Sequence, residues 1–251
     1  MGFFSFLKGK GNEPEQTNAP VQEKTQTGTV VIDMSKSQEN LNKVLINMSK
    51  DSKVDMSKHT ARVAVAMDYS GSMSNLFANG SVQDTITRLL PISLKFDDNG
   101  ELECWLFSNG KERLKAVTKD NYKDYVKQVM KKAHMGMGGT NYAPVLTEMV
   151  HYYKDIEPSS IPAFIIFITD GENWDTEETN DIIRELSEYN IFVQFVGIGD
   201  EDFKYLKSLD DMKGRKHDNT GFTAVEDMCK MTDEELYTEL LRQYKDWLNN
   251  K

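Results

Sequence analysis

The chain has 251 residues, a formal net charge of −10 and 39% hydrophobic residues. This composition supports a sizeable folded core and argues against a nucleic-acid partner, because phosphate binding needs clustered lysine and arginine. No segment approaches the ~18 consecutive apolar residues of a membrane-spanning helix. The two cysteines, Cys104 and Cys229, fit free thiols in a reducing compartment better than a disulfide framework, so we expect a cytoplasmic protein.

The N-terminal part of the chain is expected to lie outside the main domain. Residues 1–28 are predicted to be a flexible tail and linker, since they are mostly polar, contain two prolines and lack periodicity. The apolar residues within 3–7 could contact a membrane surface or a partner, although a disordered tip is the favoured interpretation. Residues 29–60 are interpreted as a short adaptor, with a strand in TVVIDMSK (29–36) and an apolar patch in LNKVLINMSK.

Residues 61–251 are predicted to form one domain in which strands and helices alternate. Apolar runs predict strands at 62–67, 101–107, 161–169 and 191–199, and the continuous run at 161–169 is typical of a strand covered on both sides of a sheet. Apolar residues at helical spacing predict helices at 84–96, at 122–133, from Pro144 onward, at 176–189, at 203–209 and after the capping box of Thr232 and Glu235. This alternation is typical of an α/β fold with a doubly wound, mostly parallel sheet and helices on both faces.

Two of the predicted strands end at an acidic residue. Asp68 follows the strand at 62–67, and Asp170 follows the strand at 161–169. In open α/β sheets, ligands bind outside the carboxyl ends of the strands. We therefore expect both acids at one edge of the sheet, where a ligand would bind.

Hydroxyl side chains accompany these acids. Ser70 and Ser72 alternate with the first acid, and Thr140 lies beside two glycines in the loop MGMGGTNYAP, residues 135–144. A small set of oxygen donors with two carboxylates suits Mg²⁺ or Mn²⁺, whereas softer metals would require histidine or cysteine. The four histidines show no paired ligand spacing, which argues against zinc. The predicted metal-binding residues are Asp68, Ser70, Ser72, Thr140 and Asp170.

This ordered set, with Gly171 after the second acid, resembles the metal-ion-dependent adhesion site of the von Willebrand factor A (vWA) domain family. The resemblance covers about residues 60–248. Within the family, VDMSKHTARVAVAMDYSGSM and GGTNYAPVL are most similar to the bacterial tellurium-resistance and stress-response branch, called TerF-like, and GGTNYAPV is also similar to copines. The segment at 29–60 resembles fragments of the TerD-like domain of those proteins, but it is too short to be a whole one.

The resemblance implies a Rossmann-like vWA fold and a role in protein binding rather than catalysis. It implies that Ser70 and Ser72 bind the ion directly and that Thr140 binds it in a way that depends on its loop. It also implies that Asp68 and Asp170 act mainly through waters. A glutamate or aspartate of a protein partner would then take an open coordination position. The implied function is a Mg²⁺-dependent protein–protein interaction module in a tellurium-resistance or stress-response system.

Large apolar side chains near the predicted ligands have two interpretations. They could form a hydrophobic rim that contacts the partner, or they could pack beneath the loops. The residues concerned are Phe77, Met135, Met137, Tyr142 and Trp174.

The competing hypothesis is a Mg²⁺-dependent haloacid-dehalogenase-like phosphatase, with Asp68 as nucleophile and Thr169 beside it. That chemistry needs a second carboxyl two residues further on as general acid. The position is occupied by Ser70, which cannot serve as that proton donor. Asp200 and Asp202 are then expected to cap the helix at 203–209. The sequence therefore favours a protein that is not an enzyme.

Overall fold

A six-stranded sheet forms the centre of the computed structural model, which describes residues 32–97, 99–171 and 173–251. The predicted tail at 1–28, including the apolar residues within 3–7, lies outside the described residues. The strand order is β3-β2-β1-β4-β5-β6, with β3 antiparallel to β2 and all other neighbours parallel. The strands are β1 (Arg62–Asp68), β2 (Leu102–Phe107), β3 (Lys111–Val117), β4 (Ala163–Thr169), β5 (Ile191–Ile198) and β6 (Thr220–Val225).

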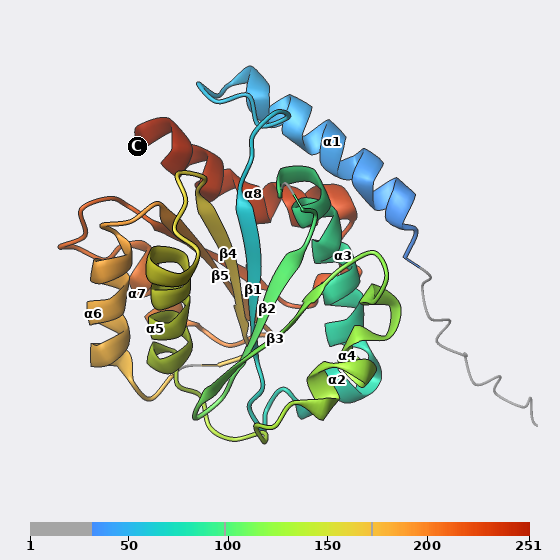
Figure 1. Cartoon of the computed structure of the whole chain (residues 1–251), viewed down its shortest axis with the longest axis vertical. Coiled ribbons are helices and arrows are strands. Elements are labelled where there is room, and N and C mark those ends of the chain that lie inside the picture. The colour runs from blue at the N-terminus through green and yellow to red at the C-terminus, as the bar shows by residue number, and fades with distance from the viewer. Residues whose placement is uncertain (1–31, 98, 172) are drawn as a thin grey trace, which may run out of the picture. The chain divides into compact units, whose positions relative to one another are not determined.

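Helices cover both faces of the sheet (Figure 1). One face is covered by α2, α3, α4 and α8, with α1 packed on α3 and α8, and the other face packs against α5, α6 and α7. This arrangement confirms the predicted doubly wound, mostly parallel α/β fold. The helices are α1 (Met34–Lys50), α2 (Ser74–Asn79), α3 (Ser81–Phe96), α4 (Tyr125–Gln128), α5 (Ala143–His151), α6 (Thr176–Leu186), α7 (Lys204–Asp210) and α8 (Asp233–Asn250).

The central strands are apolar on both sides because both sides are covered. In β1, Val63 and Val65 pack into the core beneath α3 and α8, whereas Ala64 and Ala66 pack into the core beneath α5. Burial of each methylene contributes about 0.8 kcal/mol, so neither face of such a strand tolerates polar residues well. This double burial explains why the predicted strands at 62–67, 161–169 and 191–199 are predominantly apolar.

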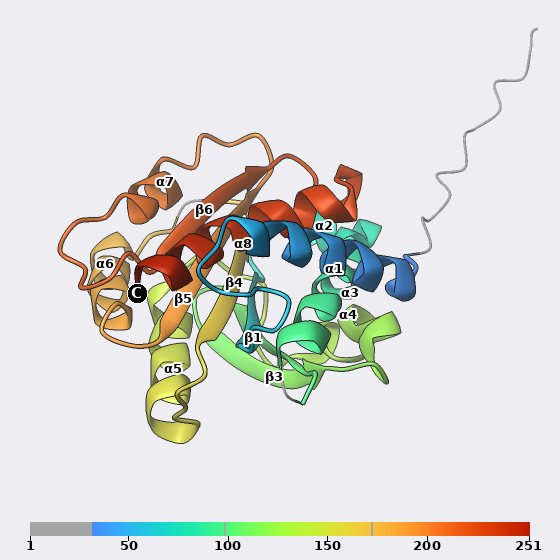
Figure 2. The same cartoon turned by 90° about the horizontal axis from the view of Figure 1, so that it is seen from above.

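Helix α1 corrects the interpretation of the adaptor segment. The predicted strand at 29–36 is wrong where the structure describes it, because α1 begins at Met34. The Asp33 carboxylate caps the helix by accepting hydrogen bonds from the N–H groups of Ser35 and Lys36, at 3.0 and 3.3 Å. Figure 2 shows α1 lying along α8, and the described residues from Ile32 to Lys251 form one compact unit.

The amphipathic segment at 122–133 is not one continuous helix as predicted. The Gln83 side chain of α3 inserts where a helical hydrogen bond would form: its Nε2 donates to the Tyr122 carbonyl at 2.6 Å, and its Oε1 accepts from the Val126 N–H at 3.0 Å. The segment is therefore divided into a 3₁₀ turn, the single turn of α4 and a second 3₁₀ turn. At Val129 the backbone leaves the helical region, with φ −121° and ψ −64°.

The expected caps of α7 are also wrong. The residue that precedes the helix is Phe203, whose φ of 48° lies in the left-handed region. No side chain caps this end, and Asp202 forms ion pairs with Lys204 and Lys207 instead. The capping box of α8 is confirmed, since the Glu235 N–H donates to the Thr232 hydroxyl and the Glu235 carboxylate accepts from the Thr232 N–H.

Candidate metal centre

The five predicted metal-binding residues come from three loops at one end of the sheet, the lower end in Figure 1. Strands β1 and β4 are parallel neighbours, so Asp68 at the end of β1 and Asp170 directly after β4 lie at the same edge. Ser70 and Ser72 lie in the loop between β1 and α2, and Thr140 precedes α5. The prediction that both acids share one edge is confirmed by the strand order.

Three of these residues form a continuous hydrogen-bonded chain. The hydroxyl oxygens of Ser70 and Ser72 are 2.9 Å apart, and the Ser72 hydroxyl donates to Asp170 Oδ1 at 2.8 Å. Oxygen atoms of two hydroxyls and one carboxylate are therefore gathered in one place. Such clusters of hard oxygen donors are what Mg²⁺ and Mn²⁺ prefer.

Asp68 is held rigidly beneath this chain. Its side chain is 0% exposed, and both of its oxygens accept hydrogen bonds: Oδ1 from the Ser70 N–H at 2.7 Å and Oδ2 from the Thr169 hydroxyl at 2.6 Å. Burial raises the pKa of the Asp68 carboxyl to about 6, and burial also raises the pKa of Asp170. Thr169, which the phosphatase hypothesis singled out, thus positions the buried acid.

The electrostatics of this edge fit a bound cation. No lysine, arginine or histidine among the described residues forms a hydrogen bond or ion pair with Asp68 or Asp170. A buried carboxylate without a positive partner is costly, and a divalent ion would supply that charge. Ser70, Ser72 and Asp170 offer oxygen atoms to such an ion, with Asp68 beneath them. The residues present therefore fit Mg²⁺ or Mn²⁺.

Thr140 belongs to a loop that is hydrogen-bonded to the serine loop. The Gly71 N–H donates to the Gly138 carbonyl at 2.9 Å, and Ser70 forms an isolated β-bridge with Gly138. Thr140 is 8% exposed, and its hydroxyl makes no hydrogen bond to another described residue. A hydroxyl with no partner among the described residues is available for another ligand.

Ser108 and Asn109, which the sequence pattern does not reveal, hold the loop of Thr140 from below. The Ser108 hydroxyl donates to the Gly136 carbonyl at 3.2 Å, and Asn109 Oδ1 accepts from the Gly139 N–H at 2.6 Å. A Cβ atom added at Gly138 would lie only 2.1 Å from Asn109 Oδ1. A side chain at this position would displace Asn109, so the close approach favours glycine, as the glycine-rich loop suggests.

Asp175 is a third residue beside the site that the sequence reasoning missed. Its carboxylate accepts hydrogen bonds from the N–H groups of Tyr142 and Ala143, at 3.0 and 2.8 Å, at the start of α5. It also accepts from Asn173 Nδ2 at 2.7 Å. In addition, the Trp174 N–H donates to the Thr140 carbonyl at 3.1 Å. These bonds join the loop after β4 to the loop that carries Thr140.

The predicted hydrophobic rim is partly wrong. Phe77 and Tyr142 are buried in the core, and the Tyr142 hydroxyl donates to the Gly171 carbonyl at 2.5 Å, so neither faces a partner. Met135 is partly buried against the core. Met137 and Trp174, in contrast, are 39% and 81% exposed. These two side chains are the apolar surface beside the candidate metal centre.

Two further features are absent among the described residues, a cluster of acidic, histidine or cysteine metal ligands and a membrane-spanning helix. No group of three or more His, Cys, Asp and Glu side chains there could hold a metal ion. Within the same residues, no helix is both long and apolar enough to cross a membrane.

Solved structures with similar folds are vWA domains and proteins with a metal-ion-dependent adhesion site. The VWA domain of SpRpn10 has a TM-score of 0.54 and 12% identity, covering 73% of this chain and 95% of that one. Manganese-loaded TRAP protein from Plasmodium vivax has a TM-score of 0.52 and 14% identity, covering 75% and 74%. Proximal thread matrix protein 1 from the mussel byssus, with a zinc-occupied adhesion motif, has a TM-score of 0.50 and 13% identity, covering 75% and 46%, so this chain spans less than half of it. At these identities the likeness shows the fold.

Sequence comparison is more specific. The protein YcbR of Bacillus subtilis strain 168, described as uncharacterized, is 39% identical over 198 residues, which is 78% of this chain and 81% of YcbR. A family profile for the vWA domain found at the TerF C terminus matches residues 60–251. The chain therefore belongs to the TerF-like vWA family.

Proposed function

We propose that this protein is a metal-dependent protein-binding module. In this proposal, Mg²⁺ or Mn²⁺ is held by Ser70, Ser72 and Thr140, with Asp68 and Asp170 balancing its charge. The bound ion would supply an open coordination position for an aspartate or glutamate of a protein partner. The TerF-like family supports a further part of the proposal, that the module acts in a cytoplasmic tellurium-resistance or stress-response system.

One observation carries the proposal: the hydrogen-bonded chain of Ser70, Ser72 and Asp170 above a fully buried Asp68 that has no cationic partner among the described residues. Among the described residues, this cluster consists of the two neutral hydroxyls of Ser70 and Ser72 and the carboxylate of Asp170. These groups do not fully neutralise the charge of a divalent ion, so the ion can also bind an anionic group of a partner. An acidic side chain is such a group, and the protein's own charge of −10 would otherwise repel it.

The exposed side chains of Met137 and Trp174 support a contact surface around this point. Tryptophan is among the residues that most often dominate binding energy at protein interfaces. We propose that Trp174 packs against the partner near its acidic residue. It would then contribute to affinity without contributing to metal binding.

The phosphatase alternative is not favoured by the geometry. A nucleophilic carboxylate must reach a substrate, but Asp68 is buried and each of its oxygens already accepts a hydrogen bond. Ser70, at the position of the general acid, has no dissociable proton in the useful pH range.

The proposal is tested by immobilising four proteins and passing cell lysate over them in Mg²⁺ and in EDTA. The four are the wild type, Ser72→Ala, Trp174→Ala and the control Ser74→Ala, whose hydroxyl is exposed two residues further on. We expect one set of proteins to be retained by the wild type and Ser74→Ala in Mg²⁺ only. Retention that is the same in EDTA, or in Ser72→Ala, would show that the metal does not control binding.

A further inference from the structure

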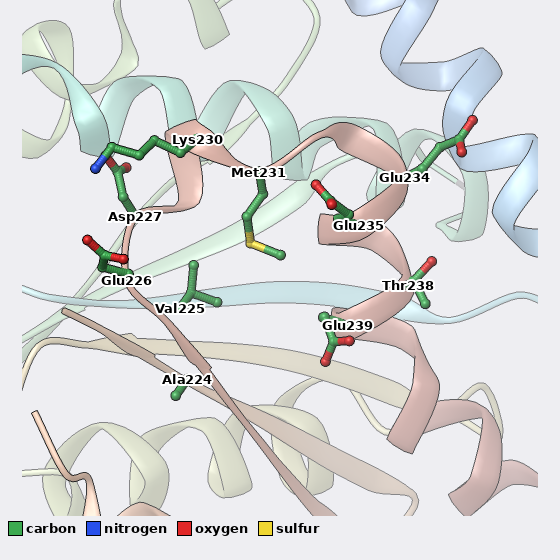
Figure 3. A pocket seen from close by; sticks show the side chains of 10 residues that line it. All are labelled: Ala224, Val225, Glu226, Asp227, Lys230, Met231, Glu234, Glu235, Thr238 and Glu239. Carbon is green, nitrogen blue, oxygen red and sulfur yellow. The ribbon is translucent and has the colours of Figure 1, made fainter. Parts of the chain in front are cut away.

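We propose that a groove beside β6 binds an extended, lysine- or arginine-bearing segment of a protein partner, which adds a strand to this edge of the sheet. The groove lies between the end of β6 and the first half of α8 and has a volume of about 620 Å³ (Figure 3). We call it the β6–α8 groove. None of the residues that line it is among the candidate metal-binding residues. Its lining includes Ala224, Val225, Glu226, Met231, Glu235 and Glu239.

The first observation is an open sheet edge. Strand β6 is the last in the sheet, and among the described residues no strand pairs with its outer side. The Asn219 carbonyl accepts a hydrogen bond from the Val193 N–H at 3.0 Å, and the Val225 carbonyl accepts one from the Gly199 N–H at 2.9 Å. The backbone polar groups of Asn219 and Val225 therefore point toward β5. Peptide groups alternate in direction along a strand. The N–H and carbonyl of Ala224 therefore point away from the sheet.

One side chain of the protein itself is hydrogen-bonded to the first part of this edge. The Phe222 N–H donates to Gln243 Oε1 at 2.9 Å, and Gln243 Nε2 is held by both carboxylate oxygens of Asp210 at 2.9 Å. Gln243 thus occupies the first part of the edge as a side-chain substitute for a neighbouring strand. From Ala224 onward, the edge lines the groove. Open edges of this kind accept an added strand unless a charge, proline or bulge protects them.

The second observation is the charge of the groove, which specifies the partner. Its walls carry five carboxylates, those of Glu226, Asp227, Glu234, Glu235 and Glu239, and one basic residue. That residue, Lys230, is already paired with Asp227 at 3.6 Å. Within the described residues, Glu226 and Glu234 have no ion pair. Glu239 pairs with Arg242 at 3.9 Å, so the charge of the groove is only partly compensated, and lysine or arginine side chains of an added strand would meet the remaining negative charge.

The floor of the groove is apolar. Met231 projects into it between the two acidic walls, and Ala224 and Val225 lie beneath (Figure 3). Side chains of an added strand alternate between two directions, so a segment with alternating basic and apolar residues matches both features. An acidic segment would be repelled. The partner segment bound here therefore differs in charge from the acidic residue proposed at the metal centre.

The walls of the groove are also preformed. The Arg88 guanidinium of α3 donates to the carbonyls of Met228 and Met231, and the capping box fixes Glu235 at the start of α8. A partner would bind without ordering this segment first, which lowers the entropic cost of association.

The test uses a fluorescent peptide of alternating lysine and valine, with fluorescence anisotropy measured in EDTA so that the metal centre is not involved. The double reversal Glu226→Lys/Glu239→Lys should weaken binding by about tenfold or more. The matched control is Glu177→Lys/Glu178→Lys, which makes the same change in net charge on the exposed surface of α6. A peptide of alternating glutamate and valine should not bind. Equal weakening by the two reversals, or equal binding of the two peptides, would overturn the proposal.

Strand addition is tested separately by amide hydrogen exchange. With the lysine–valine peptide bound, exchange at the Ala224 N–H should slow by about tenfold or more, because a partner carbonyl would accept from it. The Ala224→Pro variant, which lacks this N–H, should bind the peptide more weakly than the wild type. If Ala224 exchanges equally fast with and without bound peptide, no strand is added at this edge and the proposal fails.

Discussion

Replacing Arg88 with methionine should lower the free energy of unfolding by about 3–5 kcal/mol, the usual cost of breaking a buried ion pair from one side. Only 6% of the Arg88 side chain is exposed, and its Nε donates to Asp233 Oδ1 at 2.9 Å. Its two terminal nitrogens donate to the carbonyls of Met228 and Met231. The same aspartate accepts from the Ser37 hydroxyl of α1 at 2.7 Å. The guanidinium therefore joins α3, α8 and, through Asp233, α1.

The magnitude follows from what methionine leaves behind. Two carbonyls lose a donor, each at a cost of about 1 kcal/mol, and the Asp233 carboxylate loses a charge-assisted bond that contributes about 1.5–3 kcal/mol. Asp233 is the first residue of α8, where the helix dipole and 16% side-chain exposure recover part of this loss. At roughly 2–4 °C per kcal/mol for a chain of this size, the melting temperature should fall by about 10 °C.

Urea denaturation followed by circular dichroism measures the change. The matched control is Arg242→Met on the surface of α8, where the ion pair with Glu239 spans 3.9 Å and half of the arginine is exposed. This variant should lose no more than about 0.5 kcal/mol. If Arg88→Met is as stable as Arg242→Met, the idea that the guanidinium holds three helices together is refuted.

Three further predictions concern single side chains. Burial lowers the pKa of His59 to about 4. As the pH falls below the ordinary pKa of histidine, the unfolded chain therefore takes up a proton that the folded chain does not. Stability should drop by roughly 1 kcal/mol between about pH 7 and about pH 5, with allowance for the partly exposed side chain. In urea titrations, His59→Gln should lose this part of the pH dependence, and an unchanged slope would count against it. Gly138→Ala should cost roughly 1–2 kcal/mol because its Cβ meets Asn109 Oδ1; adding Asn109→Ala should recover part of the loss, whereas additive effects in the double-mutant cycle would exclude the clash. Burial raises the pKa of the Cys104 thiol to about 12, so a thiol-specific reagent should modify the exposed Cys229 alone in the native protein; equal rates at both cysteines would contradict this.

The sequence predicts the fold well where burial is complete. Strands β1, β4 and β5 are covered on both faces and consist mainly of apolar residues, so their positions and the parallel sheet follow from the pattern. The edge strands β3 and β6 lack such an apolar run and are not predicted from the sequence. β3 alternates exposed and half-buried residues and consists largely of charged side chains, and β6 contains Gly221, whose missing side chain leaves room for Gln194.

The candidate site shows the same division. Asp68 and Asp170 can be placed together from the sequence because parallel strands deliver them to one edge. The supporting residues cannot, since Asn109 and Asp175 act on backbone groups that are about thirty residues away in the chain. Burial at the loops is also invisible in the pattern, which is why Phe77 and Tyr142 resemble rim residues although they belong to the core.

The central claim is that Ser70, Ser72, Thr140 and the two acids bind a divalent cation. Titration of Mn²⁺ into the metal-free protein, followed by electron paramagnetic resonance, tests this most directly, with wild type, Ser72→Ala and Ser74→Ala compared at equal concentration. We predict one bound ion that Mg²⁺ displaces, with an affinity that falls by about tenfold or more in Ser72→Ala and stays unchanged in Ser74→Ala. Equal binding by all three proteins, or no binding by the wild type, would contradict the account.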